Sequence, residues 1–171
     1  MSFIGIRNAE RRDAPLLVQI AYDAWESGIL ALQRERPGMR AAEHRRLENI
    51  VAETLDRIIV AELDDVPVGW CSRARGRSYI PFLFVMPELQ CQGIGTLLLH
   101  RMEALLELEG ARRVHLETPA DNVRAVRFYE RQGYQILALR AEGPSAHQPF
   151  MSIHLEKRLM PFTGVIDEEE E

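Results

Sequence analysis

Cysteine is scarce in this 171-residue chain, which has only Cys71 and Cys91. Two cysteines so far apart are too few for a zinc site, and they do not imply a disulfide framework. The pattern is typical of two reduced thiols in a cytosolic protein. We therefore expect neither a structural metal nor a stabilising disulfide.

Long apolar runs are also missing. No stretch approaches the roughly 20 apolar residues that a membrane helix requires. The amino-terminal residues "MSFIGIRNAERRD" lack the basic start and the long apolar core of a signal peptide. We expect a soluble, cytoplasmic protein with no membrane partner.

The chain has no excess of basic residues, since its formal net charge is −5. The acidic run Asp167–Glu171 supplies all of that excess, so the rest of the chain is close to neutral. This balance argues against a nucleic-acid-binding surface. Because like charges at such density repel one another, we expect residues 161–171 to form a disordered acidic tail. The length then predicts a single domain over residues 1–160.

What the sequence does contain is an alternation of strand-like and helix-like segments. Apolar residues recur at helical spacing around residues 14–30 and again over 95–109, and a charged helix is expected over about 41–55. The predicted order is β-α-α-β-β-β-α-β-α-β-β, which indicates an α/β (mixed α+β) sheet with helices on both faces. Pro81 lies inside the apolar run 78–85, where it predicts a bulge or an unpaired edge because proline cannot donate to a strand ladder.

The stretch "QCQGIG", residues 90–95, stands where that apolar run turns into a leucine-rich helix. A helix start leaves up to four amide hydrogens unpaired and carries about half a positive charge, which suits an anion. Gly93 and Gly95 would let a phosphate approach the main chain. A P-loop would need a lysine after the last glycine, and a dinucleotide-binding fingerprint would need a third glycine. On these residues alone, a tight turn with no ligand remains an alternative.

Two motifs together resemble the GNAT superfamily of acyl-CoA-dependent N-acetyltransferases. Residues 90–95 match the pattern Q/R-x-x-G-x-G/A, and "NVRAVRFYERQGY", residues 122–134, matches N-x-x-A-x-x-F-Y-x-x-x-G-F/Y. The well-matched region covers about residues 79–140. The resemblance implies a central, mostly antiparallel sheet of about seven strands, with a splayed parallel pair at the cofactor site.

The resemblance also implies acetyl-CoA as co-substrate, with no metal. Its pyrophosphate would bind the amides of Gln90, Cys91, Gln92, Gly93, Ile94, Gly95 and Thr96. Its pantetheine arm would lie between the strand ending at Val85 and the strand ending at Thr118. Main-chain groups of Phe84, Val85 and Met86 would position the thioester, and Asn122 would contact the cofactor, cap its helix, or do both.

For the chemistry, Tyr129 resembles the family tyrosine that faces the sulfur of CoA. A phenol titrates near 10 and a thiol near 8.5, so complete proton transfer from Tyr129 would be uphill by about 2 kcal/mol. We therefore favour a hydrogen bond to the departing sulfur. Glu117 is the leading candidate for the base, alongside a role as an ordinary strand carboxylate. Glu88, Tyr79 and His115 are weaker candidates, and a mechanism with no dedicated base is the remaining option.

The acceptor site is the least specified part of the sequence. In the resembled family it is shaped by the first two helices and by the loop between the last strands, here residues 22–40 and 141–150. Tyr22, Trp25 and Glu26 are candidates to line it, although both aromatic residues also fit a hydrophobic core and Glu26 also fits a helix surface.

The function that the resemblance implies is transfer of an acetyl group from acetyl-CoA to a primary amine of a small molecule or a protein, by direct attack in a ternary complex. One alternative is a non-catalytic acyl-CoA-binding or sensing domain. Another is a nucleotide-binding protein that uses the glycine turn. Family members often pair through terminal strands, so a homodimer is an additional expectation.

Overall fold

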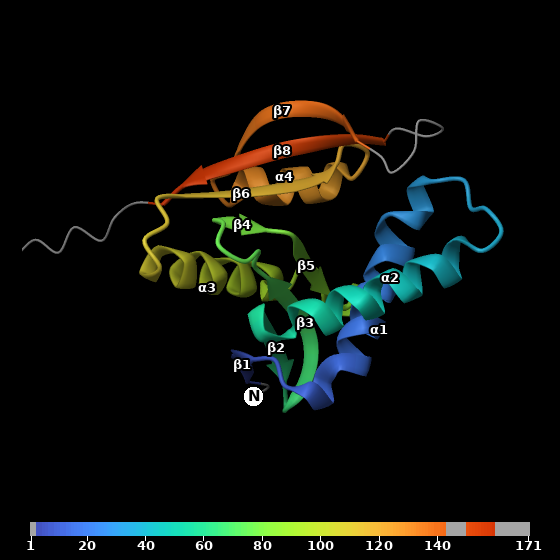
Figure 1. Cartoon of the computed structure of the whole chain (residues 1–171), viewed down its shortest axis with the longest axis horizontal. Helices are drawn as coiled ribbons and strands as arrows, with labels where there is room; N and C mark the ends of the chain where they lie inside the picture. The colour runs from blue at the N-terminus through green and yellow to red at the C-terminus, as the bar shows by residue number, and fades with distance from the viewer. Residues whose placement is uncertain (1–2, 143–149, 160–171) are drawn as a thin grey trace, which may run out of the picture.

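A computed structural model of the chain describes residues 3–142 and 150–159. The described part contains four α-helices and eight strands, joined by short 3-10 turns (Figure 1). Their order is β1 (Ile4–Asn8), α1 (Ala14–Gly28), α2 (Met39–Thr54), β2 (Ile58–Leu63), β3 (Val66–Ser72), β4 (Tyr79–Ile80), β5 (Phe82–Val85), α3 (Ile94–Leu108), β6 (Arg113–Pro119), α4 (Val123–Arg131), β7 (Gln135–Glu142) and β8 (Phe150–Arg158). The predicted tail, residues 161–171, and most of the loop predicted between the last two strands lie outside the described residues.

The strands form two four-stranded sheets. The first has the order β1-β2-β3-β5 and is antiparallel throughout. The second has the order β4-β6-β8-β7, in which only the β4–β6 pair is parallel. The expected mixed, mostly antiparallel α/β fold is therefore confirmed.

Pro81 explains why eight strands are present rather than about seven. The apolar run 78–85 was expected to be one strand, but it divides at this proline. Tyr79 and Ile80 pair with β6 in the second sheet, whereas Phe82–Val85 pair with β3 in the first. Because Pro81 has no amide hydrogen to give to either ladder, the chain leaves one sheet and enters the other at this residue.

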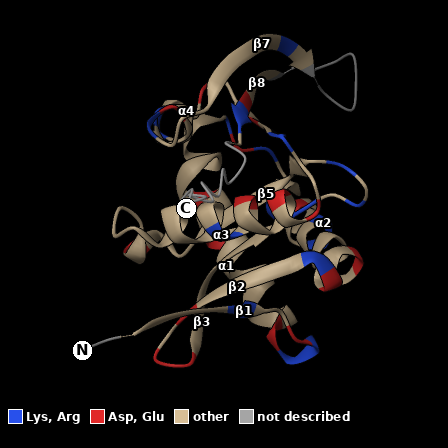
Figure 2. Cartoon of the chain, turned by 90° about the vertical axis from the view of Figure 1, so that its left-hand side faces the viewer, with Lys and Arg blue, Asp and Glu red and all other residues tan. Residues whose placement is uncertain are grey.

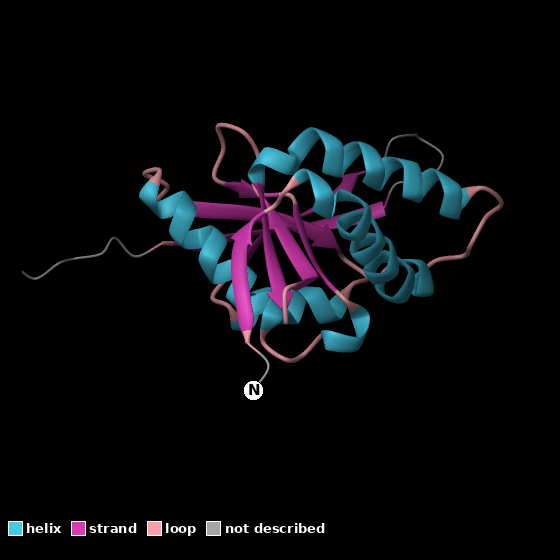
Figure 3. Cartoon of the chain, turned by 90° about the horizontal axis from the view of Figure 1, so that it is seen from below, coloured by secondary structure: helices cyan, strands magenta, loops and turns pink. Residues whose placement is uncertain are grey.

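The first sheet lies between two helical layers, which Figure 3 shows as helices on both sides of the strands. On one face Ile58, Val60 and Trp70 pack against apolar residues of α1 and α2, such as Leu17 and Leu47. On the other face, residues of β2 and β3 join a cluster with the apolar stripe of α3. This alternation is the period-two pattern of a sheet that is buried on both sides.

The second sheet is asymmetric. Its inner face contributes Ile80, Leu116 and Leu155 to the cluster that contains the α3 stripe, and Phe128 and Tyr129 of α4 pack against the same cluster. Alternate residues of β4, β6 and β8 point to the outer face, on the side of the first sheet where α1 and α2 lie. The junction between the two sheets can thus be reached from two sides, the inner face that packs against α3 and α4 and the opposite, outer face.

Among the described residues, every helix falls short of the length and apolar character that a membrane crossing demands.

Candidate active site

The glycine loop joins the end of β5 to the start of α3 and is held in place by its own first residue. The Gln90 side chain donates from Nε2 to the Val85 carbonyl at 3.1 Å. Cys91 and Gly93 adopt left-handed backbone conformations, with φ of 61° and 87°. Gly93 is the residue that immediately precedes α3, and a Cβ placed on it would meet open space. The loop therefore requires glycine at 93 for its backbone geometry.

This geometry leaves main-chain donors unpaired at the start of α3. The first helical hydrogen bond runs from the Leu97 amide to the Gly93 carbonyl, at 3.0 Å. The amides of Ile94, Gly95 and Thr96 precede it, so they have no carbonyl of their own helix to bind. Together with the positive end of the helix dipole, these donors are suited to an anion, as the sequence predicts.

Gly95 has a different environment from Gly93. A Cβ on Gly95 would face Phe128 of α4 at 3.5 Å and Val85 of β5 at 3.8 Å. Gly95 therefore lies at the junction of α3, β5 and α4, and its missing side chain faces protein atoms rather than open space. Space for a phosphate can therefore explain the glycine at position 93 better than the glycine at position 95.

Helix α4 lies beside the loop and adds polar side chains to it. Asn122 precedes α4, and its Oδ1 accepts a hydrogen bond from the Ala125 amide at 3.2 Å, so its capping role is present. The Arg124 guanidinium donates to the Cys91 sulfur at 2.9 Å. Gln132 donates to the Thr96 hydroxyl at 3.2 Å, which ties the end of α4 to the first turn of α3. Arg124 therefore places a cation beside the unpaired amides of α3.

The outer edge of β5 offers main-chain groups to a ligand. Met86 donates its amide to the Val68 carbonyl of β3 at 2.8 Å. Because hydrogen-bonded pairs alternate along antiparallel strands, Phe84 and Met86 direct their main-chain groups at β3, and Leu83 and Val85 direct theirs at the opposite edge. In the part of the chain that the structure describes, no strand pairs with that edge. Of the three residues predicted to position a thioester, only Val85 directs its main-chain groups at this edge. Its carbonyl already accepts from Gln90, which leaves its amide facing that edge.

Tyr129 lies on the inner side of the junction between the sheets. Its ring contacts Phe128 and Tyr134 edge-on, with centroid distances of 5.2 and 5.7 Å. Burial raises the pKa of the Tyr129 hydroxyl well above its usual range, and the nearby Cys71 and Tyr79 add to the rise. The phenol is therefore protonated at neutral pH and can act as a hydrogen-bond donor.

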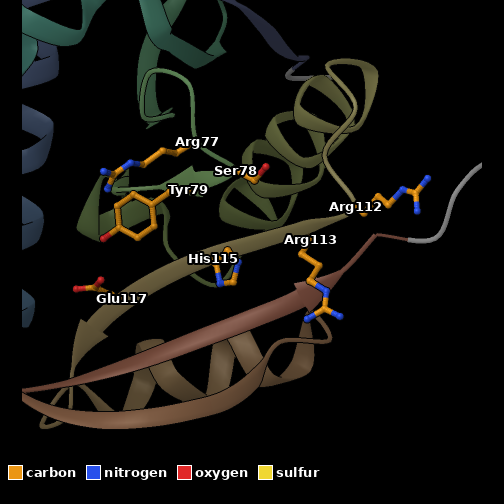
Figure 4. A pocket seen from close by; sticks show the side chains of 7 residues that line it. All are labelled: Arg77, Ser78, Tyr79, Arg112, Arg113, His115 and Glu117. Atoms are coloured by element: carbon orange, nitrogen blue, oxygen red, sulfur yellow. The ribbon is translucent and has the colours of Figure 1, made fainter.

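Glu117 lies on the outer face of β6, and the sheet register brings His154 of β8 opposite to it. His154 Nδ1 is 3.2 Å from Glu117 Oε1, and both side chains are mostly buried. Tyr79 of β4 and His115 of β6 share this outer face, because they are register partners in the parallel pair. Figure 4 shows that the Tyr79 and Glu117 side chains point toward the same end of the pocket on the outer face of β4 and β6. A carboxylate next to an imidazole can accept a proton from an incoming nucleophile.

The three residues predicted to line the acceptor site are on α1 and are unequally placed. Trp25 is only 6% exposed, so little of its surface can meet a ligand. Tyr22 is half-buried, and its ring contacts Trp25 and His44 of α2. Glu26 pairs with Arg40 of α2, which also pairs with Glu35. A cationic amine would therefore have to compete with Arg40 for the Glu26 carboxylate.

Comparison with known proteins identifies the family. The model of the acetyltransferase (GNAT) family matches residues 17–134, which is more than half of the chain. The chain belongs to the GNAT family. This confirms the resemblance drawn from the two motifs, and with it the expected class of enzyme, an acyltransferase.

Similar proteins add detail to this GNAT assignment. The fission yeast protein N-alpha-acetyltransferase 30 is 40% identical over 86 residues, which cover 50% of this chain and 56% of that protein, so the match spans about half of that curated relative. A GCN5-related N-acetyltransferase from Rhodopseudomonas palustris has a TM-score of 0.74 at 21% identity, covering 93% of this chain and 98% of the other. The PaiA N-acetyltransferase from Thermoplasma acidophilum, solved in complex with coenzyme A, has a TM-score of 0.69 at 19% identity, covering 92% and 99%. At these identities the solved structures show the shared fold.

Two residues of the candidate site, Arg124 and His154, were absent from the sequence prediction. Arg124 lies inside the second motif but at a position that the motif leaves open, so only its distance to Cys91 reveals it. His154 comes 37 positions after Glu117 and is revealed only by the β6–β8 register. In residues 3–142 and 150–159, no group of three or more His, Cys, Asp or Glu side chains could hold a metal ion.

Proposed function

We propose that this protein is an acetyl-CoA-dependent N-acetyltransferase that acts by direct attack of a primary amine in a ternary complex. The supporting observation is the arrangement around one junction. The unpaired amides of α3 and Tyr129 lie on the inner side of the junction between the two sheets. Glu117 and His154 lie on its outer side. Two substrates can therefore meet there from opposite faces, which a ternary-complex reaction requires.

On the inner side, the residues fit CoA. The unpaired amides at the start of α3, with Arg124 beside them, would hold the pyrophosphate of CoA. The unpaired edge of β5 at Val85 would align the pantetheine arm as an additional strand. When bound, acetyl-CoA supplies an activated acetyl group as a thioester.

Tyr129 stabilises the departing sulfur. The reaction forms a bond between the amine nitrogen and the acetyl carbon and breaks the bond between that carbon and sulfur. Negative charge then develops on sulfur, and the Tyr129 hydroxyl donates a hydrogen bond to it. Because burial raises the pKa of Tyr129, complete proton transfer is less favourable than a hydrogen bond, and solvent can protonate the released thiolate.

Glu117 accepts the proton of the amine, and His154 orients Glu117. Only a neutral amine has a lone pair for attack, and the attacking nitrogen must lose a proton as the amide forms. The Glu117 carboxylate, oriented by His154 at 3.2 Å, accepts that proton directly or through a water molecule. This assigns one proton acceptor to the outer face and one hydrogen-bond donor to the inner face.

The acceptor is a primary amine of a small molecule or of a protein. The fission yeast relative is named for acetylating an α-amine, which makes a peptide amino terminus one acceptor to test. The open outer face has room for either kind of acceptor. A panel of small amines and peptides would distinguish between these two kinds of acceptor.

The test is a panel of amines and amino-terminal peptides with acetyl-CoA, monitored by thiol release and by mass spectrometry of the acetylated product. We expect at least one acceptor to give turnover that depends on enzyme concentration. Binding of acetyl-CoA without turnover on any amine would overturn the proposal and favour the non-catalytic sensing function. Stabilisation by ATP or NAD but not by CoA would indicate a nucleotide-binding protein instead.

A further inference from the structure

A cavity of about 710 Å³ opens on the outer face of the second sheet, between the segment leading into β4 and strand β6. It is lined by Arg77, Ser78 and Tyr79 from the first segment and by Arg112, Arg113, His115 and Glu117 from β6 and the residue before it. It is shallow and open to solvent, so it would cover only part of a bound ligand. Because Glu117 is in the lining, the cavity begins at the proposed proton acceptor and extends away from it along β6.

The cavity is positively charged, although the chain as a whole carries a net charge of −5. Figure 2 shows basic and acidic residues interspersed along the ribbon, for example on α2 and α3. Three arginines line the cavity against one carboxylate, Glu117. Glu156 lies beside it, 3.1 Å from Arg113 and 3.5 Å from His115. Arg113 is therefore partly neutralised by its neighbour, and the remaining positive charge comes from Arg77 and Arg112.

Arg77 is the arginine at the catalytic end. In Figure 4 its side chain extends to the same side as Tyr79 and Glu117, whereas Arg112 and Arg113 lie toward the opposite end of the cavity. Within residues 3–142 and 150–159, the Arg77 side chain makes no ion pair, and it is exposed to solvent. Arg75, two residues earlier on the same loop, instead pairs with Asp56 at 3.0 Å and is outside the cavity.

From this geometry we infer that the acceptor amine carries an anionic group, a carboxylate in the simplest case, and that Arg77 binds this group. The inference rests on the proposed acetyltransferase function and specifies its acceptor. The amine would lie at Glu117, and the carboxylate would lie at the same end of the cavity, at Arg77. A guanidinium pairs with a carboxylate through two parallel hydrogen bonds, so Arg77 would select acceptors by charge and by geometry.

The carboxylate could belong to a free amino acid or to an acidic side chain near the start of a peptide. Two matched series separate these sources. The first compares free amino acids with their carboxamides. The second compares amidated tetrapeptides that have Glu or Gln at position two. Each peptide pair differs in one negative charge and little else. In the free amino acid series the carboxylate also makes the α-amine more basic, so kcat/KM is calculated there per concentration of neutral amine. The ratio within a pair then measures recognition of the charge.

We expect the charged member of at least one series to be favoured about 10- to 100-fold, mainly through a lower KM. The variant Arg77→Gln should reduce that ratio to nearly 1, whereas Arg75→Gln should leave it unchanged. A preference confined to the first series identifies a small acceptor, and one confined to the second identifies an acidic peptide. Equal kcat/KM within both series, or a ratio that Arg77→Gln does not alter, would overturn the inference.

A binding measurement keeps the two proposals distinguishable if no acceptor is turned over. The N-acetylated amino acids and their carboxamides are titrated calorimetrically into the protein saturated with CoA. Preferential binding of the carboxylate that is lost in Arg77→Gln supports the anionic subsite even though the proposed reaction has failed. Absence of that preference rejects the subsite as well.

Discussion

The two sides of the junction between the sheets are built on different principles. The inner side is made of the main-chain amides at the start of α3, those of Ile94, Gly95 and Thr96, with Arg124 and Tyr129 added by one neighbouring helix. The outer side is made of side chains from separate strands, among them Tyr79, Glu117 and His154, which only the sheet register brings together. A contiguous backbone site of this kind suits a constant part of a ligand, whereas a dispersed side-chain site can be changed one residue at a time.

This contrast predicts how each side responds to substitution. On the inner side most substitutions act through the conformation of the loop, since the main-chain donors themselves cannot be removed. On the outer side each side chain can be deleted singly. The following four variants test this difference, in decreasing order of expected effect.

Replacing Tyr129 by Phe should lower kcat about 100- to 1000-fold, because it removes the hydrogen-bond donor to the departing sulfur. The KM for acetyl-CoA should change by less than about threefold. Steady-state kinetics measures both. Because the pKa of this phenol is raised, the wild-type enzyme should also keep its activity as the pH approaches 10, where an ordinary tyrosine would ionise. An unchanged kcat would remove Tyr129 from the mechanism.

Replacing Glu117 by Gln should lower kcat/KM about 10- to 100-fold at neutral pH. The loss should diminish at higher pH, where more of the amine arrives deprotonated. The measurement is a pH profile of kcat/KM for the variant and the wild type. If the loss is the same at every pH, Glu117 binds or orients the acceptor and the proton goes elsewhere.

Replacing Gly93 by Ala should weaken CoA binding about 5- to 10-fold, because alanine resists the φ of 87° that the loop requires at this residue. Gly110→Ala is the matched control. Gly110 also has a left-handed backbone, with φ of 93° and open space around a Cβ, but it follows the far end of the same helix. Both variants should lose about 1 kcal/mol of stability, and calorimetry should show weaker CoA binding only in Gly93→Ala. Equal CoA affinities in the two variants would contradict the assignment of the loop.

Replacing Tyr134 by Phe should destabilise the fold by about 1–2 kcal/mol and change kcat by less than about threefold. The Tyr134 hydroxyl donates to the buried Glu103 of α3 at 2.9 Å, and Lys157 of β8 binds the other oxygen of Glu103 at 2.9 Å. This network joins α3 to the second sheet. Denaturant unfolding measures the stability. A loss of kcat as large as that of Tyr129→Phe would show that Tyr134 contributes to the chemistry through its contact with the Tyr129 ring.

The two sides also differ in how well the sequence alone predicted them. The glycine loop, the helix after it and the Asn122 cap are local features, so a short motif and helical periodicity were sufficient. His154 and Arg77 carry no local signal, because their relation to Glu117 depends on strands that meet only in the folded chain. Helical periodicity left two roles open for Trp25, the acceptor site and the hydrophobic core, and its burial favours the core.

Pro81 shows the same limit within the fold. Its missing donor predicted an irregularity in the run 78–85, and an irregularity is present. The division of that run between two sheets depends on β6, which lies about 30 residues later in the chain and supplies the partner for β4. The sequence therefore predicts that Pro81 interrupts a strand, but only the folded chain shows that the two halves join different sheets.

The division at Pro81 makes the segment 79–85 unusually intolerant of changes in length. β4 and β5 each have a fixed partner in a different sheet and only one residue between them. An inserted or deleted residue would shift at least one strand by one position and turn its side chains to the opposite face. If β4 shifted, the Tyr79 side chain would no longer line the cavity on the outer face and the Ile80 side chain would no longer be buried in the core. A loop without two fixed strand partners can change its length and leave the sheets intact, but the segment 79–85 has to keep its residue count for both sheets to keep their registers.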